Sequence, residues 1–309
     1  MNDDSRSDGH SYRYLRYEPH DEGIIVRITL DRADTKNAQS RGLLVELDDA
    51  FARAERDDTV RVVVLAGAGT TFSSGHDLGS KQALAGRNPG PQQHPTYTMN
   101  GATRLSSERR MLQEWHYFFQ NTLRWRNLRK ITIAEVQGGV YAAGLMLAWA
   151  CDLIVSADNT LFADPVGPRL GGAGVEYFAH PWEFGPRKAK ELLLTGDGID
   201  ADDAYRLGMV NKVFPAQHLT ERTMQFARRI AALPTMAALM VKEAVNQSVD
   251  AQGFPTALNA CFSLHHVVHG HWAEIHGGEP SVATAQDGIA DWRTAPPITR
   301  ASKDTAGPS

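Results

Sequence analysis

The 309-residue sequence lacks the features that mark secreted, membrane-spanning or disulfide-stabilised chains. Two cysteines, Cys151 and Cys261, are too few for a disulfide framework, and the polar residues 1–22 contain no apolar segment of a secretory signal. The longest apolar run, residues 140–151, is shorter than the ~20 residues that a transmembrane helix needs, and Asp152 closes it. These absences predict a soluble protein of the reducing cytoplasm.

The chain also lacks an excess of charge of either sign. It has 32 Lys and Arg against 36 Asp and Glu, a formal net charge of -4, so no overall positive field would attract nucleic acid or an anionic membrane. Its 42% of hydrophobic residues is enough to bury a substantial core. We expect residues 13–232 to form an α/β core and 233–295 a helical C-terminal region. The tails 1–12 and 296–309, which lack apolar periodicity, are predicted to be disordered.

Alternating strand and helix patterns support the α/β class. A strand over residues 24–30, an amphipathic helix over 40–56 and a β-branched strand over 60–66 form one parallel crossover unit. A second unit has a helix over 108–127, a strand over 131–136, a turn at Gly138-Gly139, a helix over 142–150 and short strands over 152–156 and 161–163. The remaining pattern is helical, over 174–182, 186–194, 201–206, 218–232, 235–249, 252–275 and 287–292.

Common cofactor and hydrolase motifs are absent. The glycine-rich loop after residue 66 has Phe72 where a dinucleotide fingerprint needs glycine, and it lacks the Gly-Lys-Ser/Thr ending of a phosphate-binding loop. The sequence contains neither Gly-x-Ser-x-Gly nor His-Glu-x-x-His. We therefore expect no cofactor, and no metal site of the zincin type.

Two loops that each follow a parallel strand are the candidate site. The first is Phe72-Ser73-Ser74-Gly75-His76-Asp77-Leu78, and the second begins at Val136 and includes Gly138-Gly139 and Ala142-Ala143-Gly144. Small residues let the backbone approach a ligand, and free N–H groups where a strand turns into a helix attract an anion. Two such N–H groups can form an oxyanion hole, although the glycines could also serve only to pack turns against the sheet.

Taken in order, these segments resemble the crotonase (enoyl-CoA hydratase/isomerase) superfamily. The resemblance extends over residues 24–292 and includes Thr29-Leu30-Asp31-Arg32, the two loops, Phe162-Ala163-Asp164-Pro165, the segment 204–213 and Asp287-Gly288-Ile289-Ala290-Asp291. It implies a spiral of ββα units with a C-terminal helical region that builds a homo-oligomer, a trimer or dimer of trimers. It also implies an acyl-CoA thioester as substrate, with coenzyme A as part of the substrate.

By position, the resemblance assigns the two oxyanion donors to the backbone N–H groups of His76 and Ala143. The family usually has alanine where His76 stands, so this imidazole either faces the substrate or points away into solvent. The resemblance also implies a wider set of substrate-contacting positions, with Lys36 and Lys81 as partners for the CoA phosphates. These positions are Lys36, Ala38, Ser74, Gly75, His76, Asp77, Leu78, Lys81, Gly139, Met146 and Val166.

The sequence departs from the family at its acid/base groups. Met146 and Val166 occupy the positions of the two glutamates with which family hydratases add water, and neither side chain can carry a proton. Glu176, at the predicted start of helix 174–182, is the proposed replacement, with His180 on the same helical face. We expect burial near Met146 and Val166 to raise the pKa of Glu176.

Several alternatives remain open from the sequence. Asp164, or His116 with Tyr117, could supply the missing proton transfer. The protein could be a double-bond isomerase with Glu176 as its single base, or an acyl-CoA-binding scaffold without activity. A zinc-dependent hydrolase is a third rival, because the C-terminal helix carries a pair of histidines at i, i+4 spacing. Only Glu274 offers a nearby third ligand, so we expect no metal and attribute these histidines to packing or to contacts between subunits. The histidines of that helix are His265, His266, His269, His271 and His276.

Overall fold

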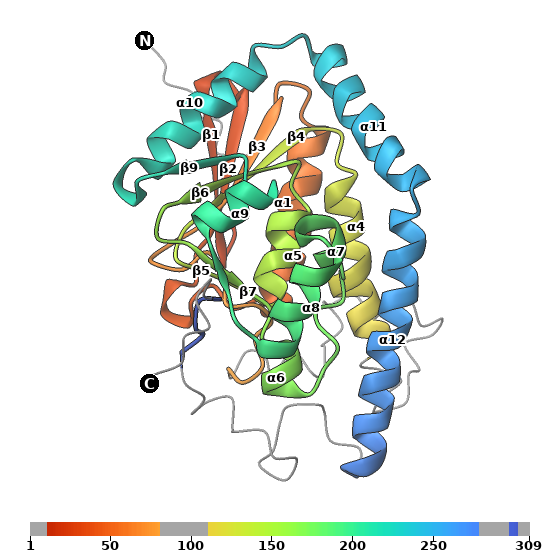
Figure 1. Cartoon of the computed structure of the whole chain (residues 1–309). Helices are drawn as coiled ribbons and strands as arrows, with labels where there is room; N and C mark the ends of the chain where they lie inside the picture. The colour runs from red at the N-terminus through yellow and green to blue at the C-terminus, as the bar shows by residue number, and fades with distance from the viewer. Residues whose placement is uncertain (1–10, 81–110, 278–296, 302–309) are drawn as a thin grey trace.

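The computed structural model describes residues 11–80, 111–277 and 297–301, and it has the predicted α/β architecture (Figure 1). A six-stranded sheet forms its centre, with β1 antiparallel to β2 and every later neighbour parallel. In spatial order its strands are β1 (Leu15–His20), β2 (Ile25–Leu30), β3 (Val62–Gly67), β4 (Ile131–Val136), β6 (Leu153–Ala157) and β9 (Lys212–Phe214). A smaller sheet contains β5 (Gly139–Tyr141), β7 (Leu161–Ala163) and β8 (Ile199–Asp200).

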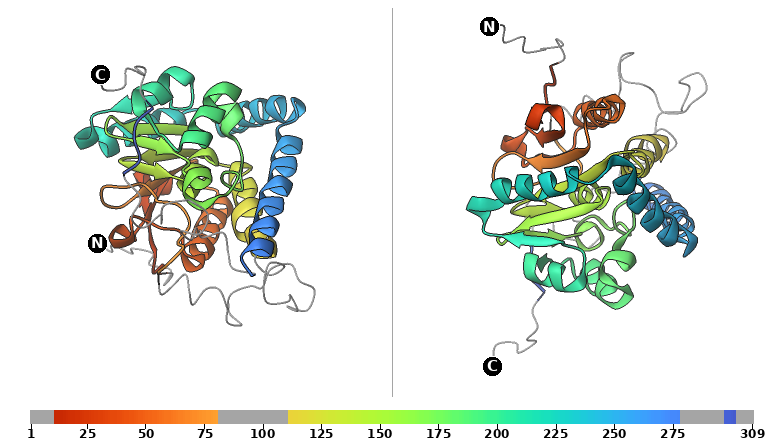
Figure 2. Two further views of the ribbon diagram at one scale, coloured as in Figure 1. Left: turned by 60° about the horizontal axis from the view of Figure 1, so that its bottom comes forward. Right: turned by 90° about the horizontal axis from the view of Figure 1, so that it is seen from above.

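Both faces of the larger sheet are buried at its central strands, which explains why β3 is a continuous apolar run and β4 a nearly continuous one. Successive side chains of a strand point to opposite faces, so Val63 and Leu65 enter one hydrophobic cluster and Val62 and Val64 enter the other. The first cluster includes the apolar stripe of α1 (Arg41–Arg56), and the second is covered by α10 (Leu219–Ala231). Figure 2 shows α10 lying across the strands.

The other helices surround this core and position the site. The π-helical segment η4 (Glu114–Gln120) continues into α4 (Asn121–Arg126). The long helix α12 (Phe254–Ile275) packs against η4 through stacked Phe119 and Phe262, whose ring centroids are 4.5 Å apart. The α-helices not yet given are α5 (Ala143–Trp149), α6 (Val166–Leu170), α7 (His180–Phe184), α8 (Pro186–Thr195), α9 (Ala201–Leu207) and α11 (Thr235–Ala251). In Figure 1, α11 and α12 lie at the outer edge of the molecule.

Some sequence predictions are wrong. The strand β1 was not predicted, and parts of both expected tails are bonded: the Tyr12 hydroxyl donates to Asp49 at 2.8 Å, and the amide of Ala301 donates to the Gly198 carbonyl at 2.7 Å. The predicted helix 174–182 begins only at His180. The predicted helix 287–292 lies outside the described residues. Among the described helices, none is both long and apolar enough to cross a membrane.

Candidate active site

The structure brings the two glycine-containing loops into contact. The amide of Ser73 donates to the Gly139 carbonyl at 3.3 Å, and the amide of Tyr141 donates to the Ser73 carbonyl at 3.0 Å. Gly75 has a φ of 93°, and a Cβ atom there would lie only 3.1 Å from the Ala143 nitrogen. Glycine is therefore required at position 75, both for its left-handed backbone and for the close approach of the second loop.

The N–H groups of His76 and Ala143, one in each loop, are the candidate oxyanion donors. Gly75 and Asp77 are bonded to Gln39, through Gln39 N–H to the Gly75 carbonyl at 2.8 Å and Asp77 N–H to the Gln39 carbonyl at 3.1 Å. Among the described residues no acceptor takes the N–H of His76 between them, nor that of Ala143. Two amides without an acceptor, in two loops that touch, are compatible with the donor pair expected from the sequence.

Backbone strain sets the direction of the second amide. Ala142 has φ 48° and ψ -122°, a conformation that L-amino acids rarely adopt, and it turns the chain from β5 into α5. As the first residue of α5, Ala143 has an N–H with no intrahelical partner. Strain of this kind persists where the surrounding contacts enforce it, and it is concentrated at functional sites.

Asn37 holds the start of the first loop by side-chain hydrogen bonds to backbone groups. Its side chain is fully buried, accepts from the Arg32 amide at 2.9 Å, and donates to the carbonyls of Ala68 at 2.9 Å and Thr71 at 2.8 Å. These three bonds hold the end of β3 against the segment before α1.

Glu176 and His76 form a buried pair inside the site. The Glu176 Oε2 atom is 3.1 Å from His76 Nε2, and only 5% of Glu176 is exposed. The His76 ring also stacks on Phe118, with centroids 3.6 Å apart. Of the two orientations left open by the sequence, the one in which this imidazole points into solvent is wrong.

The local context of Glu176 differs from the prediction. Glu176 precedes α7 and does not share a helical face with His180, which instead lies 2.9 Å from Asp164. The Asp164 carboxylate also accepts from the amides of Val166 at 3.1 Å and Val175 at 3.0 Å. Asp164 thus holds the segment on which Glu176 stands, and its carboxylate is turned towards His180.

The expected upward shift in the pKa of Glu176 is also wrong. Burial alone raises this pKa, but the imidazoles of His76 and His265 outweigh burial and hold it below its usual value. Glu176 is therefore ionised in the folded protein at neutral pH, which is the form that a general base requires.

Behind Glu176 lies a cluster whose histidines the sequence analysis named, but it missed Glu114 and the contact of His265 with Glu176. His265 Nε2 lies 3.7 Å from Glu176 Oε1 and 3.8 Å from Glu114 Oε2, and His266 Nε2 lies 3.4 Å from the same Glu114 oxygen. Burial lowers the pKa of His265, but the two carboxylates raise it to about 9. Burial raises the pKa of Glu114, but His265 and His266 outweigh burial and hold this pKa well below its usual range. The sequence contains one signal for Glu114, an acidic residue at the start of an apolar stretch.

The other predicted site residues are spread around these loops. Met146 is buried in α5 and Val166 is half-buried at the start of α6. The Asp77 carboxylate is taken by Arg32 at 2.9 Å and by Ser80 at 2.6 Å. Lys81 lies outside the described residues.

Several of the remaining residues proposed from the sequence make backbone or aromatic contacts. The carbonyl of Lys36 accepts from the Ser74 amide at 2.9 Å, which ties this candidate CoA-binding segment to the first loop. His116 packs edge-on against Tyr117, and His276 stacks on Trp272. On α12, His271 and Glu274 are exposed, so Glu274 does not join the buried histidines.

Ala38, Leu78 and Gly139 lie in or beside the same two loops, with Ala38 buried, Leu78 half-buried and Gly139 in β5.

Comparisons with known proteins agree with this architecture. The sequence profile of the enoyl-CoA hydratase/isomerase family matches residues 20–107 and 98–273. The chain is 61% identical over 306 residues to a Mycobacterium tuberculosis protein named enoyl-CoA hydratase EchA13, covering 97% of this chain and 96% of that one. It is 31% identical over 263 residues to 4-chlorobenzoyl coenzyme A dehalogenase-2 of an Arthrobacter species, covering 82% and 86%.

A solved structure from Mycobacterium smegmatis, named as an enoyl-CoA hydratase, superposes with a TM-score of 0.75 at 41% identity, covering 86% of this chain and 98% of that one. The expected crotonase fold is thereby confirmed. The chain belongs to the enoyl-CoA hydratase/isomerase family of enzymes, within the crotonase superfamily.

Proposed function

We propose that this enzyme binds an acyl-CoA thioester and that Glu176 moves a proton on a thioester enolate held by the amides of His76 and Ala143. The observation that carries the proposal is the 3.1 Å contact between Glu176 and the His76 side chain. It links the ionised carboxylate to the same residue whose amide is unpaired. Lys36 is the proposed partner of the CoA phosphates.

The chemistry favoured by one carboxylate is movement of a double bond. Glu176 takes a proton from C2 of a 3-enoyl thioester, and the electron pair moves onto the thioester oxygen, where two backbone N–H groups stabilise the charge. The same carboxyl returns the proton to C4, and the double bond reforms between C2 and C3. Glu176 ends ionised, so one base completes the cycle.

Concerted hydration needs two acid/base groups, and Met146 and Val166 stand at both usual positions. Each general acid/base group contributes about 100- to 10,000-fold in rate. We therefore expect crotonyl-CoA to bind and to be hydrated very slowly. A hydration rate within about tenfold of an ordinary hydratase would contradict this reasoning, because that loss is smaller than the contribution of one such group.

The experiment compares wild type with Glu176→Gln, which keeps the size of the side chain and removes its titration. With a 3-enoyl-CoA, formation of the 2-enoyl thioester is followed by absorbance, and we expect a loss of about 100-fold or more with nearly unchanged thioester affinity. Glu243→Gln, on the outer helix α11, is the matched control. Full activity of the Glu176 variant would refute the assignment, and thioester binding without any turnover by wild type would favour a scaffold.

A further inference from the structure

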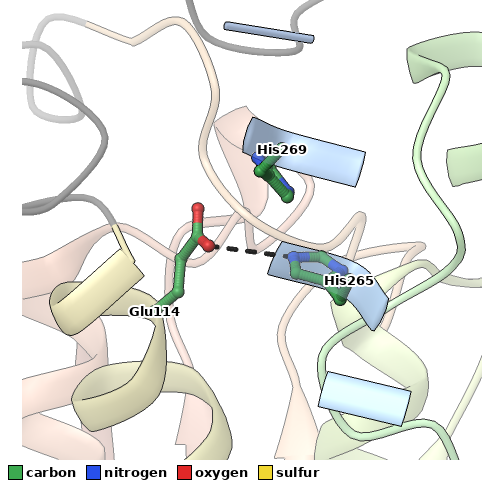
Figure 3. A group of neighbouring side chains, drawn as sticks. All are labelled: Glu114, His265 and His269. Carbon is green, nitrogen blue, oxygen red and sulfur yellow. Dashed lines mark ion pairs between the residues drawn. The ribbon is translucent and has the colours of Figure 1, made fainter. Parts of the chain in front are cut away.

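A second group of polar side chains lies behind Glu176, between η4 and α12 (Figure 3). His265 and His269 are one turn apart and therefore lie on the same face of α12. Glu114, at the start of η4, approaches them from the other side, and Figure 3 shows its carboxylate directed towards the two rings. One potential ligand atom from each of the three residues lies within 4.8 Å of the others.

Two buried atoms of this group make no hydrogen bond to the described part of the chain. Glu114 Oε2 and His265 Nε2 have only longer ion-pair contacts there, 3.8 Å to each other and 3.4 Å from Glu114 Oε2 to His266 Nε2, although the Glu114 and His265 side chains are only 9% and 6% exposed. Most buried polar atoms in proteins are hydrogen-bonded, so such exceptions require an explanation, and a bound ion is one. The two atoms are 3.8 Å apart, close to the roughly 3.4 Å that separates two ligand atoms on a tetrahedral zinc ion with bonds of about 2.1 Å.

A hydrogen bond behind His265 selects the form of its ring. His265 Nδ1 is 3.1 Å from the Gly174 carbonyl, which can only accept, so Nδ1 carries a hydrogen. A metal ion that displaces the Nε2 proton then finds the lone pair on Nε2, the nitrogen nearer Glu114. Metal-binding histidines usually have this arrangement, in which the other ring nitrogen donates to a carbonyl or carboxylate.

We propose that Glu114, His265 and His269 bind a divalent transition-metal ion of the zinc class. Two imidazoles and one carboxylate are a donor set that zinc accepts, whereas magnesium and calcium prefer oxygen ligands alone. Three protein ligands leave a position for water or another group. The site lies beside Glu176 but does not depend on the proposed function, because its ligands are distinct from the two amides and from Glu176.

The test measures metal in the full-length protein. We expect about one zinc ion per chain by elemental analysis after purification without chelator, and saturable rebinding of Zn²⁺ by calorimetry after chelation and dialysis. His269→Ala and Glu114→Gln should each weaken rebinding at least about tenfold, the lower range measured even for residues that only support a ligand. His271→Ala, an exposed histidine on the same helix, is the matched control and should bind as wild type does.

Circular dichroism of each variant checks that it folds. A crystal of the wild-type protein soaked in Zn²⁺ gives a readout that needs no variant, and an anomalous peak between the three side chains supports the site. Absence of saturable binding, equal binding by wild type and the two ligand variants, or an anomalous peak elsewhere only would each overturn the proposal.

Discussion

Replacing Asn37 with alanine should weaken both the fold and the site. The change removes three buried hydrogen bonds, to the Arg32 amide and to the carbonyls of Ala68 and Thr71. At about 1 kcal/mol net for each bond, the expected loss is about 3 kcal/mol in the free energy of unfolding. Water cannot readily replace the lost partners, because the Asn37 side chain is fully buried.

Urea denaturation followed by circular dichroism measures this loss. Asn259→Ala is the matched control, since the Asn259 side chain is exposed and donates to the Pro255 carbonyl of its own helix, and the change should alter stability by less than about 0.5 kcal/mol. The displaced loop should also misplace the His76 amide, and misplacement by about 1 Å can lower turnover about 100-fold. A loss below about 1 kcal/mol would show that the Asn37 bonds do not hold the loop.

Three further changes test other parts of the molecule. Desolvation raises the pKa of Glu183 to about 7, so this carboxyl contributes stability below its unfolded pKa of ~4.3 that is lost as the pH rises through 7. At pH 8 the melting temperature of Glu183→Gln should therefore be higher than that of wild type, and near pH 4 the two melting temperatures should be equal. The same difference in melting temperature at both pH values would contradict desolvation of the carboxylate as the cause. Phe262→Ala should cost about 3–5 kcal/mol in urea by removing the stack on Phe119, against almost nothing for the exposed Ser263→Ala, and equal midpoints would refute it. We expect the outer face of α11 to join subunits into a trimer or hexamer, so Val241→Asp should shift the sedimentation coefficient towards that of a monomer, whereas a monomeric wild type would exclude the interface.

Much of the core could be predicted because local patterns determine it. The strands at 131–136 and 161–163 have the predicted bounds, since their runs of apolar residues are buried on both sides. The strand β1 was missed because it is an edge strand in which Arg16 and Pro19 are exposed and the other polar residues are half-buried, so it lacks that pattern.

The site could be predicted only in part. The two loops follow strands that parallel pairing places side by side, so their contact follows from the order of elements. Glu114 and His265 come from helices far apart in the sequence, and no local spacing indicates that they meet. The conformation of Glu176 was mispredicted because the bonds of Asp164 to Val166, Val175 and His180 decide it, and these are tertiary contacts.

Helix α12 has an inner face that contacts the candidate site and an outer face that is exposed. Its inner face carries His265, which contacts Glu176 and the Gly174 carbonyl, and its outer face exposes Leu264 and Val267 at 61% and 65%. Any partner that binds the outer face and shifts the helix changes the free energy of the inner contacts. Thermodynamic linkage makes the effect reciprocal: a ligand that reorganises the surroundings of Glu176 must alter the affinity for that partner by the same factor. Binding of a ligand near Glu176 and binding of a partner to the outer face of α12 would then be coupled through this one helix.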